Sequence, residues 1–333
     1  MTRYLVRRLL GTVPVFLLIT LLVFLLLHAA PGDPAALLLS DATSEADVIE
    51  ARQRWGLDQP LHIQYWKFLA AAVTGDLGKS FRLAQPVSEL IAVRLPATIE
   101  LATFSILIAV TLAIPLGVWA GAKPNSWVDN LGTSFGLFGI SMPNFWLGIM
   151  LILLLAGSFH ILPSAGRSTY GIAGSQETGF YLLENALQGN WPAVKDALMY
   201  MAMPAFALGA NMIGILMRVT RSSVLEVMHE EYVVTARAKG VAEQGVLWRH
   251  VLSNALIPII TVVGLELGTL LSGSIIVETV FAWPGMGSLL ITGVTSRDYP
   301  LIMGLVLMYT VAFVTINLVI DALYGIIDPR IRY

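Results

Sequence analysis

The chain has 333 residues, of which 56% are hydrophobic and 13% are charged, with a formal net charge of -2. Soluble domains carry about 25% charged residues, so this composition, with a mean hydropathy of +0.74, excludes an ordinary soluble protein and indicates an integral membrane protein. The charge is spread over both signs, which argues against a nucleic-acid partner, and the lack of cysteine excludes disulfides and thiolate metal sites.

Six apolar stretches are each long enough to cross about 30 Å of hydrocarbon as a helix. We therefore expect an all-α polytopic membrane protein with six transmembrane helices. The first stretch ends like a signal-peptide cleavage site, but its apolar part of about 18 residues exceeds the usual 7 to 15, which favours a retained anchor over a cleaved signal peptide. The six stretches lie at 9–30, 97–122, 131–157, 200–217, 257–282 and 301–325.

Lys and Arg residues gather in alternate connecting segments, and their distribution predicts the orientation of the chain. Basic residues lie before the first stretch, at Lys123, between residues 218 and 249, and at the C-terminus. The intervening segments carry an excess of Asp and Glu. We therefore expect both termini to be cytoplasmic and the acidic segments to face outward.

The outward segment 31–96 is too long for a turn, and it mixes turn residues with amphipathic pieces at 46–55 and 61–73. It is predicted to form a small helical cap. The sequence GDLGKS at 75–80 imitates the end of a phosphate-binding P-loop, but Val73 replaces the first glycine and no strand precedes it. A turn is therefore the preferred interpretation.

No pattern of catalytic or metal-binding residues is found in the sequence. The five histidines have no ligand spacing, and no second histidine completes a metalloprotease motif after His229 and Glu230. A long outward insertion at 158–199 and a shorter one near 283–300 exceed what a turn needs. They are interpreted either as docking surfaces or as loosely packed lids.

The segment 218–256 is the longest polar connection predicted in the cytoplasm. A helix is expected from Arg218 to Lys239, ended by Gly240 in a left-handed conformation, and a second amphipathic piece at 242–255 returns to the membrane at Pro258. Antiparallel helices need only about 2 to 8 connecting residues, so this length indicates a docking element. A helix lying on the lipid surface is the alternative, although nearby Glu residues almost cancel its basic charge.

Many short motifs together resemble permease subunits of the binding-protein-dependent ABC importers, in the dipeptide, oligopeptide and nickel permease family. The likeness covers nearly the whole chain, and the combination is specific although each motif alone is weak. The motifs are PGDP at 31–34, GLDQP at 56–60, GDLG at 75–78, LPAT at 95–98, SMP at 141–143, TRSS at 220–223, TARAKG at 235–240, NALIP at 254–258, ETVF at 278–281, WPG at 283–285, RDYP at 297–300 and DPRIR at 328–332.

This resemblance implies a type I ABC importer permease fold in the cytoplasmic (inner) membrane of a bacterium or archaeon. It implies a second homologous permease subunit, two ATPase subunits, a periplasmic or lipid-anchored solute-binding protein and the lipid bilayer as partners, with no nucleic acid. ATP and Mg would bind on the ATPase subunits, so this chain would be non-catalytic and hold no cofactor. The residues implied to insert into the ATPase are Tyr232, Thr235, Ala236, Arg237, Ala238, Lys239 and Gly240.

Polar residues within the predicted spans are candidates for the translocation pathway, because an ionised group there costs about 2.5 to 3.5 kcal/mol. Glu266 lies mid-helix in a G-x-x-x-G run at 264–268, where helices approach closely. It is either a lumen-facing group that contacts a substrate amine or a buried neutral acid. Glu278 is favoured for a structural or gating role. Asn211, Asn144 and Ser141 are further candidates, although hydrogen bonds between helices are the commoner explanation for such residues.

Two classes of function remain open from the sequence. The first is an importer permease that forms half of a pathway for di- or oligopeptides, with nickel, glutathione or another small solute as alternative cargo. The second is a secondary transporter coupled to H⁺ or Na⁺ through Glu266 or Glu278, although the sequence has no clear inverted repeat. We expect three regions: an N-terminal tail and first helix at 1–30, an external cap at 31–96, and a five-helix permease domain at 97–333 containing the coupling loop 218–256 and the external insertion 158–199.

Overall fold

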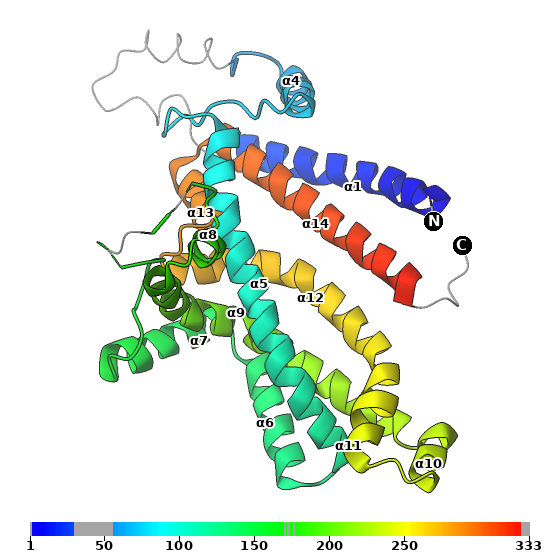
Figure 1. Cartoon of the computed structure of the whole chain (residues 1–333). Coiled ribbons are helices and arrows are strands. Elements are labelled where there is room, and N and C mark those ends of the chain that lie inside the picture. Colours follow the sequence, from blue (N-terminus) through cyan, green and yellow to red (C-terminus); the bar gives the residue numbers. More distant parts are fainter. Residues whose placement is uncertain (1, 30–55, 170, 172–173, 176, 328–333) are drawn as a thin grey trace.

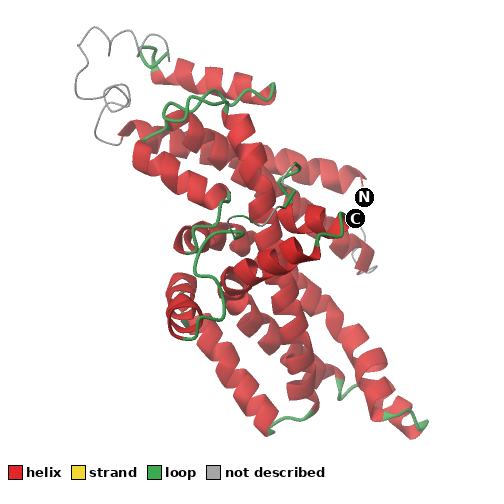
Figure 2. Cartoon of the chain, turned by 60° about the vertical axis from the view of Figure 1, so that its left-hand side comes forward, coloured by secondary structure: helices red, strands yellow, loops and turns green. Residues whose placement is uncertain are grey.

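The computed structural model describes residues 2–29, 56–169, 171, 174–175 and 177–327 (Figure 1). Most of these residues belong to helices (Figure 2). The described part contains no named strand, and the pairing of Lys79 with Pro86 is an isolated bridge. The expected all-α fold is confirmed. The predicted helix at 46–55 lies outside the described residues, whereas the one at 61–73 is present.

The elements follow one another in this order: α1 (Thr2–Ala29), α4 (Leu61–Val73), α5 (Val87–Ala122), α6 (Trp127–Ser141), α7 (Asn144–Leu151), the π-helix η1 (Ile152–Ser158), α8 (Tyr181–Leu187), α9 (Trp191–Val227), α10 (Glu231–Ala238), α11 (Glu243–Gly245), the π-helix η2 (Val246–Val251), α12 (Leu252–Val280), α13 (Met286–Ser296) and α14 (Tyr299–Ile327).

Five of the described helical segments are long and apolar enough to cross a membrane, and the bent pair 127–141 and 144–158 supplies a sixth span if it is counted as one. The expectation of one continuous third helix at 131–157 is wrong, because the two halves meet at an angle of 107°. Proline restricts the residue before it to extended conformations. Met142, which precedes Pro143, accordingly has φ -93° and ψ 128°, so α6 ends there.

Helix α9 packs closely against α5 and α6 because glycines line the contacts. A Cβ atom added to Gly209 would lie 2.8 Å from the carbonyl oxygen of Ser105 on α5. A Cβ on Gly214 would lie 2.3 Å from the carbonyl oxygen of Gly136 on α6. Small residues permit such backbone approach between membrane helices. These three helices therefore form the tightly packed centre of the subunit.

The predicted G-x-x-x-G contact on α12 is confirmed. A Cβ on Gly264 would lie 2.8 Å from Ile320, and one on Gly268 would lie 2.9 Å from Phe313, so this face packs against α14. Helix α14 in turn lies alongside α1 (Figure 1).

The polar connections define two ends of the molecule. We call the end that carries residues 123–126 and 228–245 the inner end, because the basic residues predict it to be cytoplasmic. The end that carries residues 56–86, 159–190 and 281–298 is called the outer end. Helix α5 runs from one end to the other, with α4 near its start and α10 and α11 at the far end (Figure 1).

The expected helix from Arg218 to Lys239 is interrupted. Helix α9 ends at Val227, the chain turns, and α10 begins at Glu231 after Glu230 adopts an extended conformation with ψ 143°. The turn has a packing reason, because Val233 and Ala236 on α10 belong to the same hydrophobic core as Val224 on α9. A straight helix would carry these two side chains past that core.

Candidate functional site

Helix α10 and the residues after it form the tip of the coupling loop. Gly240 has φ +79°, as the predicted left-handed helix end requires. Its N–H group bonds to the carbonyl of Arg237 at 2.9 Å, and the next N–H, on Val241, bonds to the carbonyl of Ala236 at 3.2 Å. This double closure stops α10 sharply.

The seven predicted coupling residues do not lie on one face. Ala236 is buried, 8% exposed, and packs within this chain, so its side chain is not available to contact the ATPase. Arg237 donates to Glu243 at 2.7 Å and therefore already has an acidic partner in the same chain. That hydrogen bond is the main cause that raises the pKa of Arg237. The coupling residues exposed at the surface are Tyr232, Thr235, Ala238, Lys239 and Gly240.

A second ion pair fastens α6 to α9 at the inner end. Asp129, 2% exposed, accepts hydrogen bonds from Nε and Nη2 of Arg221, the latter at 2.8 Å. It also accepts from the backbone N–H of Asn125 at 2.8 Å. The sequence analysis missed Asp129; the available signal was its place three residues after Ser126, which caps the N-terminus of α6.

The polar candidates for the pathway differ in their surroundings. Glu266 is half-buried, and its carboxylate accepts from Thr269 at 2.8 Å. Ser141 is exposed and donates to the carbonyl of Leu137 at 2.8 Å. Asn144 and Asn211 are half-buried, and Oδ1 of Asn211 has no hydrogen-bond partner among the described residues.

One of these candidates approaches α12 closely. A Cβ on Gly273 would lie 3.4 Å from Nδ2 of Asn144 and 3.2 Å from Leu208, which precedes Asn211 by three residues on α9. Glu266 precedes Gly273 by seven residues, which is about two helical turns, and so shares its face of α12. By helical spacing, Asn211 and Glu266 thus lie on the same helix faces as Leu208 and Gly273, the residues that approach each other there.

Glu278 is fully buried, at 0% exposure, near the outer end of α12. Its Oε1 accepts from the hydroxyl of Thr98 on α5 at 2.7 Å, and its Oε2 accepts from the N–H groups of Gly287 at 2.7 Å and Ser288 at 3.1 Å. Three donors from two other elements thus converge on this carboxylate. This geometry fits the structural role considered for Glu278 better than contact with a solute.

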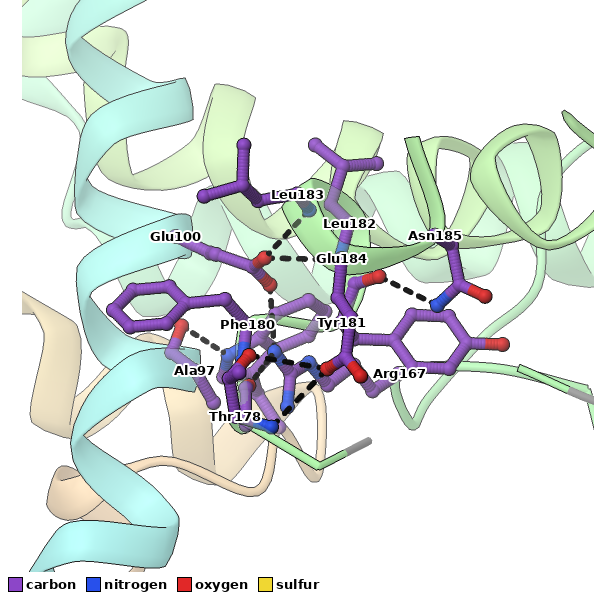
Figure 3. Close-up of polar contacts among 12 residues, drawn as sticks. Ala97, Glu100, Arg167, Thr178, Phe180, Tyr181, Leu182, Leu183, Glu184 and Asn185 are labelled. Carbon is purple, nitrogen blue, oxygen red and sulfur yellow. Dashed lines mark hydrogen bonds and ion pairs between the residues drawn. The ribbon is translucent and has the colours of Figure 1, made fainter. Parts of the chain in front are cut away.

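Glu100 lies less than one turn after Thr98 on α5 and makes a similar set of contacts (Figure 3). Its Oε2 pairs with Nη2 of Arg167 at 2.6 Å, and its Oε1 accepts from the N–H groups of Leu182 at 2.9 Å and Leu183 at 3.3 Å. The external insertion is therefore held to a membrane helix by a carboxylate.

The turn at 75–80 is bonded to the segment before α14 and does not form a phosphate-binding loop. Gly75 and Gly78 have φ +83° and +78°. The hydroxyl of Ser80 donates to Asp298, and Asp298 also accepts from the N–H of Leu301 in the first turn of α14 at 3.2 Å. The turn interpretation is supported. Among the described residues, no group of three or more His, Asp or Glu could hold a metal ion.

Comparison with known protein families shows to which family the chain belongs. Residues 113–333 match the family described as binding-protein-dependent transport system inner membrane component, and residues 1–102 match the N-terminal part of such membrane components. The chain belongs to this family. It is a multi-pass permease subunit of a binding-protein-dependent ABC importer, and these findings support this function rather than an ion-coupled secondary transporter.

Full-length relatives and a solved structure agree with the family. The chain is 43% identical over 322 residues to a probable D,D-dipeptide transport system permease protein of Escherichia coli, covering 96% of this chain and 95% of the relative. It is 39% identical to a dipeptide transport system permease protein of Alkalihalophilus pseudofirmus, and 40% identical to a glutathione transport system permease protein of Salmonella paratyphi A, each over the full length of both chains. An inward-facing structure of the MetNI methionine ABC transporter is similar to this chain, with a TM-score of 0.51 and 16% sequence identity. The match covers 70% of this chain and 93% of the chain in that structure, and it supports the fold.

Proposed function

We propose that this permease subunit forms half of a translocation pathway for di- or oligopeptides. The observation that carries the proposal is that relatives of 39% to 43% identity over nearly the whole chain are named for the transport of dipeptides, D,D-dipeptides or glutathione. Each of these named cargoes is a short peptide. Nickel or another small solute is the alternative within the family.

Uptake into proteoliposomes that contain the complete complex tests the cargo. Labelled dipeptides, D,D-dipeptides, glutathione and nickel are supplied in parallel with ATP inside the vesicles and the solute-binding protein in the outer solution. We expect saturable uptake of a short peptide and none of nickel. Nickel uptake without peptide uptake would refute the peptide assignment while leaving the family assignment intact.

We propose that the exposed face of α10 transmits the effect of ATP binding from a separate ATPase subunit. The proposal is supported by the exposure of Tyr232 (42%) and Val234 (58%) beside Thr235, Ala238 and Lys239, and by the sharp helix end at Gly240. A short rigid helix with a small exposed residue can enter a groove on a partner. ATP and Mg would be held by that partner, so this chain supplies no catalytic group.

A pair of alanine positions on α10 tests this contact. Ala238→Glu adds a charged side chain to the exposed face, and we expect it to uncouple peptide uptake from ATP hydrolysis without loss of assembly. Ala236→Glu is the matched comparison, because it places the same group in the buried core and should reduce the stability of the loop itself. Normal ATP-driven uptake by Ala238→Glu would refute the assignment.

We propose that Asn144, Asn211 and Glu266 line the pathway, with Glu278 kept out of it by its three donors. The support is that the buried amide oxygen of Asn211 lacks a hydrogen-bond partner among the described residues. This oxygen can therefore accept a hydrogen bond from a solute in the pathway. We expect Asn211→Leu to raise the KM for peptide while ATP hydrolysis continues. An unchanged KM in reconstituted transport would remove Asn211 from the pathway.

We propose that the outer end receives a solute-binding protein loaded with peptide. Exposed apolar side chains on the external insertion support this, namely Leu183 (56%), Leu187 (81%) and Trp191 (66%). Substituting Leu187 with Glu is expected to weaken stimulation of ATP hydrolysis by the binding protein. Full stimulation would favour the lid interpretation of the insertion.

A further inference from the structure

Two short helices at the outer end lack capping side chains of their own. Helix α8 is preceded by Phe180 and α13 by Gly285, and neither residue accepts a side-chain hydrogen bond from the first turn. The first N–H groups of a helix have no partner within the helix, so leaving them unpaired in a buried place is costly. The acceptors must therefore come from elsewhere in the chain.

Buried carboxylates on two long helices supply these acceptors. Glu100 on α5 binds the second and third N–H groups of α8, on Leu182 and Leu183. Glu278 on α12 binds the second and third N–H groups of α13, on Gly287 and Ser288. A negative charge at a helix N-terminus is also stabilised by the helix dipole. Each short helix is thus capped across an interface rather than within its own segment.

Arg167 connects the Glu100 capping site to the segment that precedes α13. Its Nη2 binds Glu100 and also donates to the carbonyl of Gly179 at 2.7 Å (Figure 3). Its guanidinium carbon lies 5.8 Å from the ring centre of Tyr181 and 5.7 Å from that of Trp283, within the range of cation–π contacts. The external insertion therefore touches the segment between α12 and α13 through one charged group.

The outer end of α5 contacts both capping sites. The indole N–H of Trp283 donates to the carbonyl of Ala97 at 2.9 Å, and Thr98 both donates to Glu278 and accepts from the N–H of Met286 at 2.8 Å. The N–H of Gly166 donates to the carbonyl of Phe281 at 2.8 Å. We call this group, namely Thr98, Glu100, Arg167, Glu278 and Trp283, the outer hub.

We propose that Glu100 and Glu278 are positioning residues for transport, which fasten α8 and α13 to the outer end of α5 so that the three helices move together when the membrane helices rearrange. The proposal rests on the coupling of ATP binding to movement of this subunit. It assigns no solute contact to either carboxylate. What it adds is a mechanical link between the surface that faces outward and the helix that runs to the inner end.

Spin labels can test this link directly, because the chain contains no cysteine that would compete for labelling. Cysteines are introduced at Gln188, the exposed residue that follows α8, and at Val93 on α5, which is 68% exposed. The distance between the labels is measured in the complete complex, both without nucleotide and with trapped ATP. We expect one narrow distance distribution that is the same in both states.

Substitution of Glu100 then separates capping from ion pairing. Glu100→Ala removes the acceptor for both N–H groups, and we expect a broadened distribution already in the nucleotide-free state. Glu100→Gln keeps a carbonyl oxygen for the N–H groups and loses only the charge that pairs with Arg167, so it should broaden the distribution less. Glu184→Gln is the matched control, since this carboxylate bonds to Ser175, Glu177 and Thr178 within the insertion.

A transport measurement distinguishes positioning from stability alone. The amount of peptide imported per ATP hydrolysed is expected to fall about tenfold in Glu100→Ala and to recover to within about threefold in Glu100→Gln, within the usual range of coupling between sites. If Glu100→Ala fails to assemble, Glu100→Asp replaces it, because the shorter side chain keeps the charge but withdraws the acceptor from the N–H groups of Leu182 and Leu183. We expect the same broadening and the same fall in peptide import per ATP, and wild-type values in both measurements would overturn the proposal.

Three results would overturn the proposal. One is a wild-type label distance that changes between the nucleotide-free and ATP-bound states. Another is an unaltered narrow distribution in Glu100→Ala. The third is equal peptide import per ATP in Glu100→Ala and wild type. The nucleotide-free measurement does not depend on ATP coupling, so a failure there is distinct from a failure of the coupling role proposed for α10.

Discussion

The outer hub and the tip of the coupling loop both hold short helices in place, but by opposite means. In the outer hub, the carboxylates of Glu100 and Glu278 are 7% and 0% exposed, and each accepts three hydrogen bonds from other elements. At the inner tip, the side chains of the ion pair Arg237 and Glu243 are 36% and 58% exposed, and α10 is held chiefly by apolar packing of Val233 and Ala236.

Because the charged groups are buried at the outer end and exposed at the inner tip, the two ends are suited to different roles. Buried charge pairs give fixed geometry, and losing one partner is costly, whereas exposed pairs contribute little to stability. The outer helices are therefore built into the body of the subunit. The inner tip keeps a polar surface whose groups can exchange partners, as a contact with a separate subunit requires.

The largest loss of stability is expected for Glu278→Ala. The substitution leaves one hydroxyl and two N–H donors without their acceptor in a buried site, and each such loss costs about 1 to 3 kcal/mol. The melting temperature of the purified complex should fall well below that of Thr279→Ala, a substitution of the exposed neighbour. Equal melting temperatures would show that the outer end is not held by buried carboxylates.

A smaller loss is expected at the inner end for Arg221→Ala. This change leaves Asp129 buried without its cation, and we expect a cost of about 2 kcal/mol, below the value for a fully buried pair because the side chain of Arg221 is 29% exposed. Additional substitution of Asp129 with Asn should recover part of the stability in thermal unfolding. A double variant no more stable than Arg221→Ala would contradict the pairing.

Gly240→Ala is expected to cost about 1 kcal/mol, because a residue with a Cβ is strained at φ +79°. No other atom lies within 4 Å of the added Cβ, so the effect is conformational rather than steric. Faster cleavage of the coupling loop by a protease would report this loss of stability. Gly245→Ala is the control, since Gly245 has a helical φ of -65° and the added Cβ would meet only the end of the exposed Val241 side chain, at 3.2 Å, which can move aside.

The smallest effect is expected from the pH dependence of Glu184. Its hydrogen bond from Ser175 is the main cause that lowers the pKa of this carboxyl below 4.5 in the folded protein. A lowered folded-state pKa stabilises the fold above the unfolded value and is lost as the pH falls through the folded value. The difference in melting temperature between wild type and Glu184→Gln should therefore be constant well above pH 4.5 and shrink as the pH falls through and below it. If the difference in melting temperature instead grows as the pH falls, the ionised Glu184 carboxylate does not stabilise the fold.

Much of the fold could be predicted because hydrophobic length and period report burial directly. The positions of the spans and the helix at 61–73 follow from apolar stretches, and the left-handed turn at Gly240 follows from the conformational freedom of glycine. The bend at Met142 was missed although Pro143 was visible, because a proline tolerated within a membrane helix and one that breaks it look alike in sequence. The turn before Glu231 was missed because it depends on the distant core that Val233 and Ala236 join.

The interactions of the candidate sites were harder to predict than their positions. Glu100 and Glu278 could be recognised as acidic residues in apolar surroundings, but their partners lie 67 to 83 and 9 to 180 residues away in the chain. Sequence spacing contains no information on such pairs. The same holds for Asp129 and Arg221, which are 92 residues apart.

The bend between α6 and α7 also determines what solvent can lie beside it. A helix that ends within a membrane leaves its last carbonyl groups without donors from the next turn, and hydrocarbon cannot supply them. Helix α6 has 15 residues and rises about 22 Å, which is less than the about 30 Å of hydrocarbon. We therefore expect the backbone around Ser141 and Asn144 to be bordered by water or by protein rather than by lipid tails. A change in helix direction would then show where the surroundings of the chain change from lipid to a polar medium.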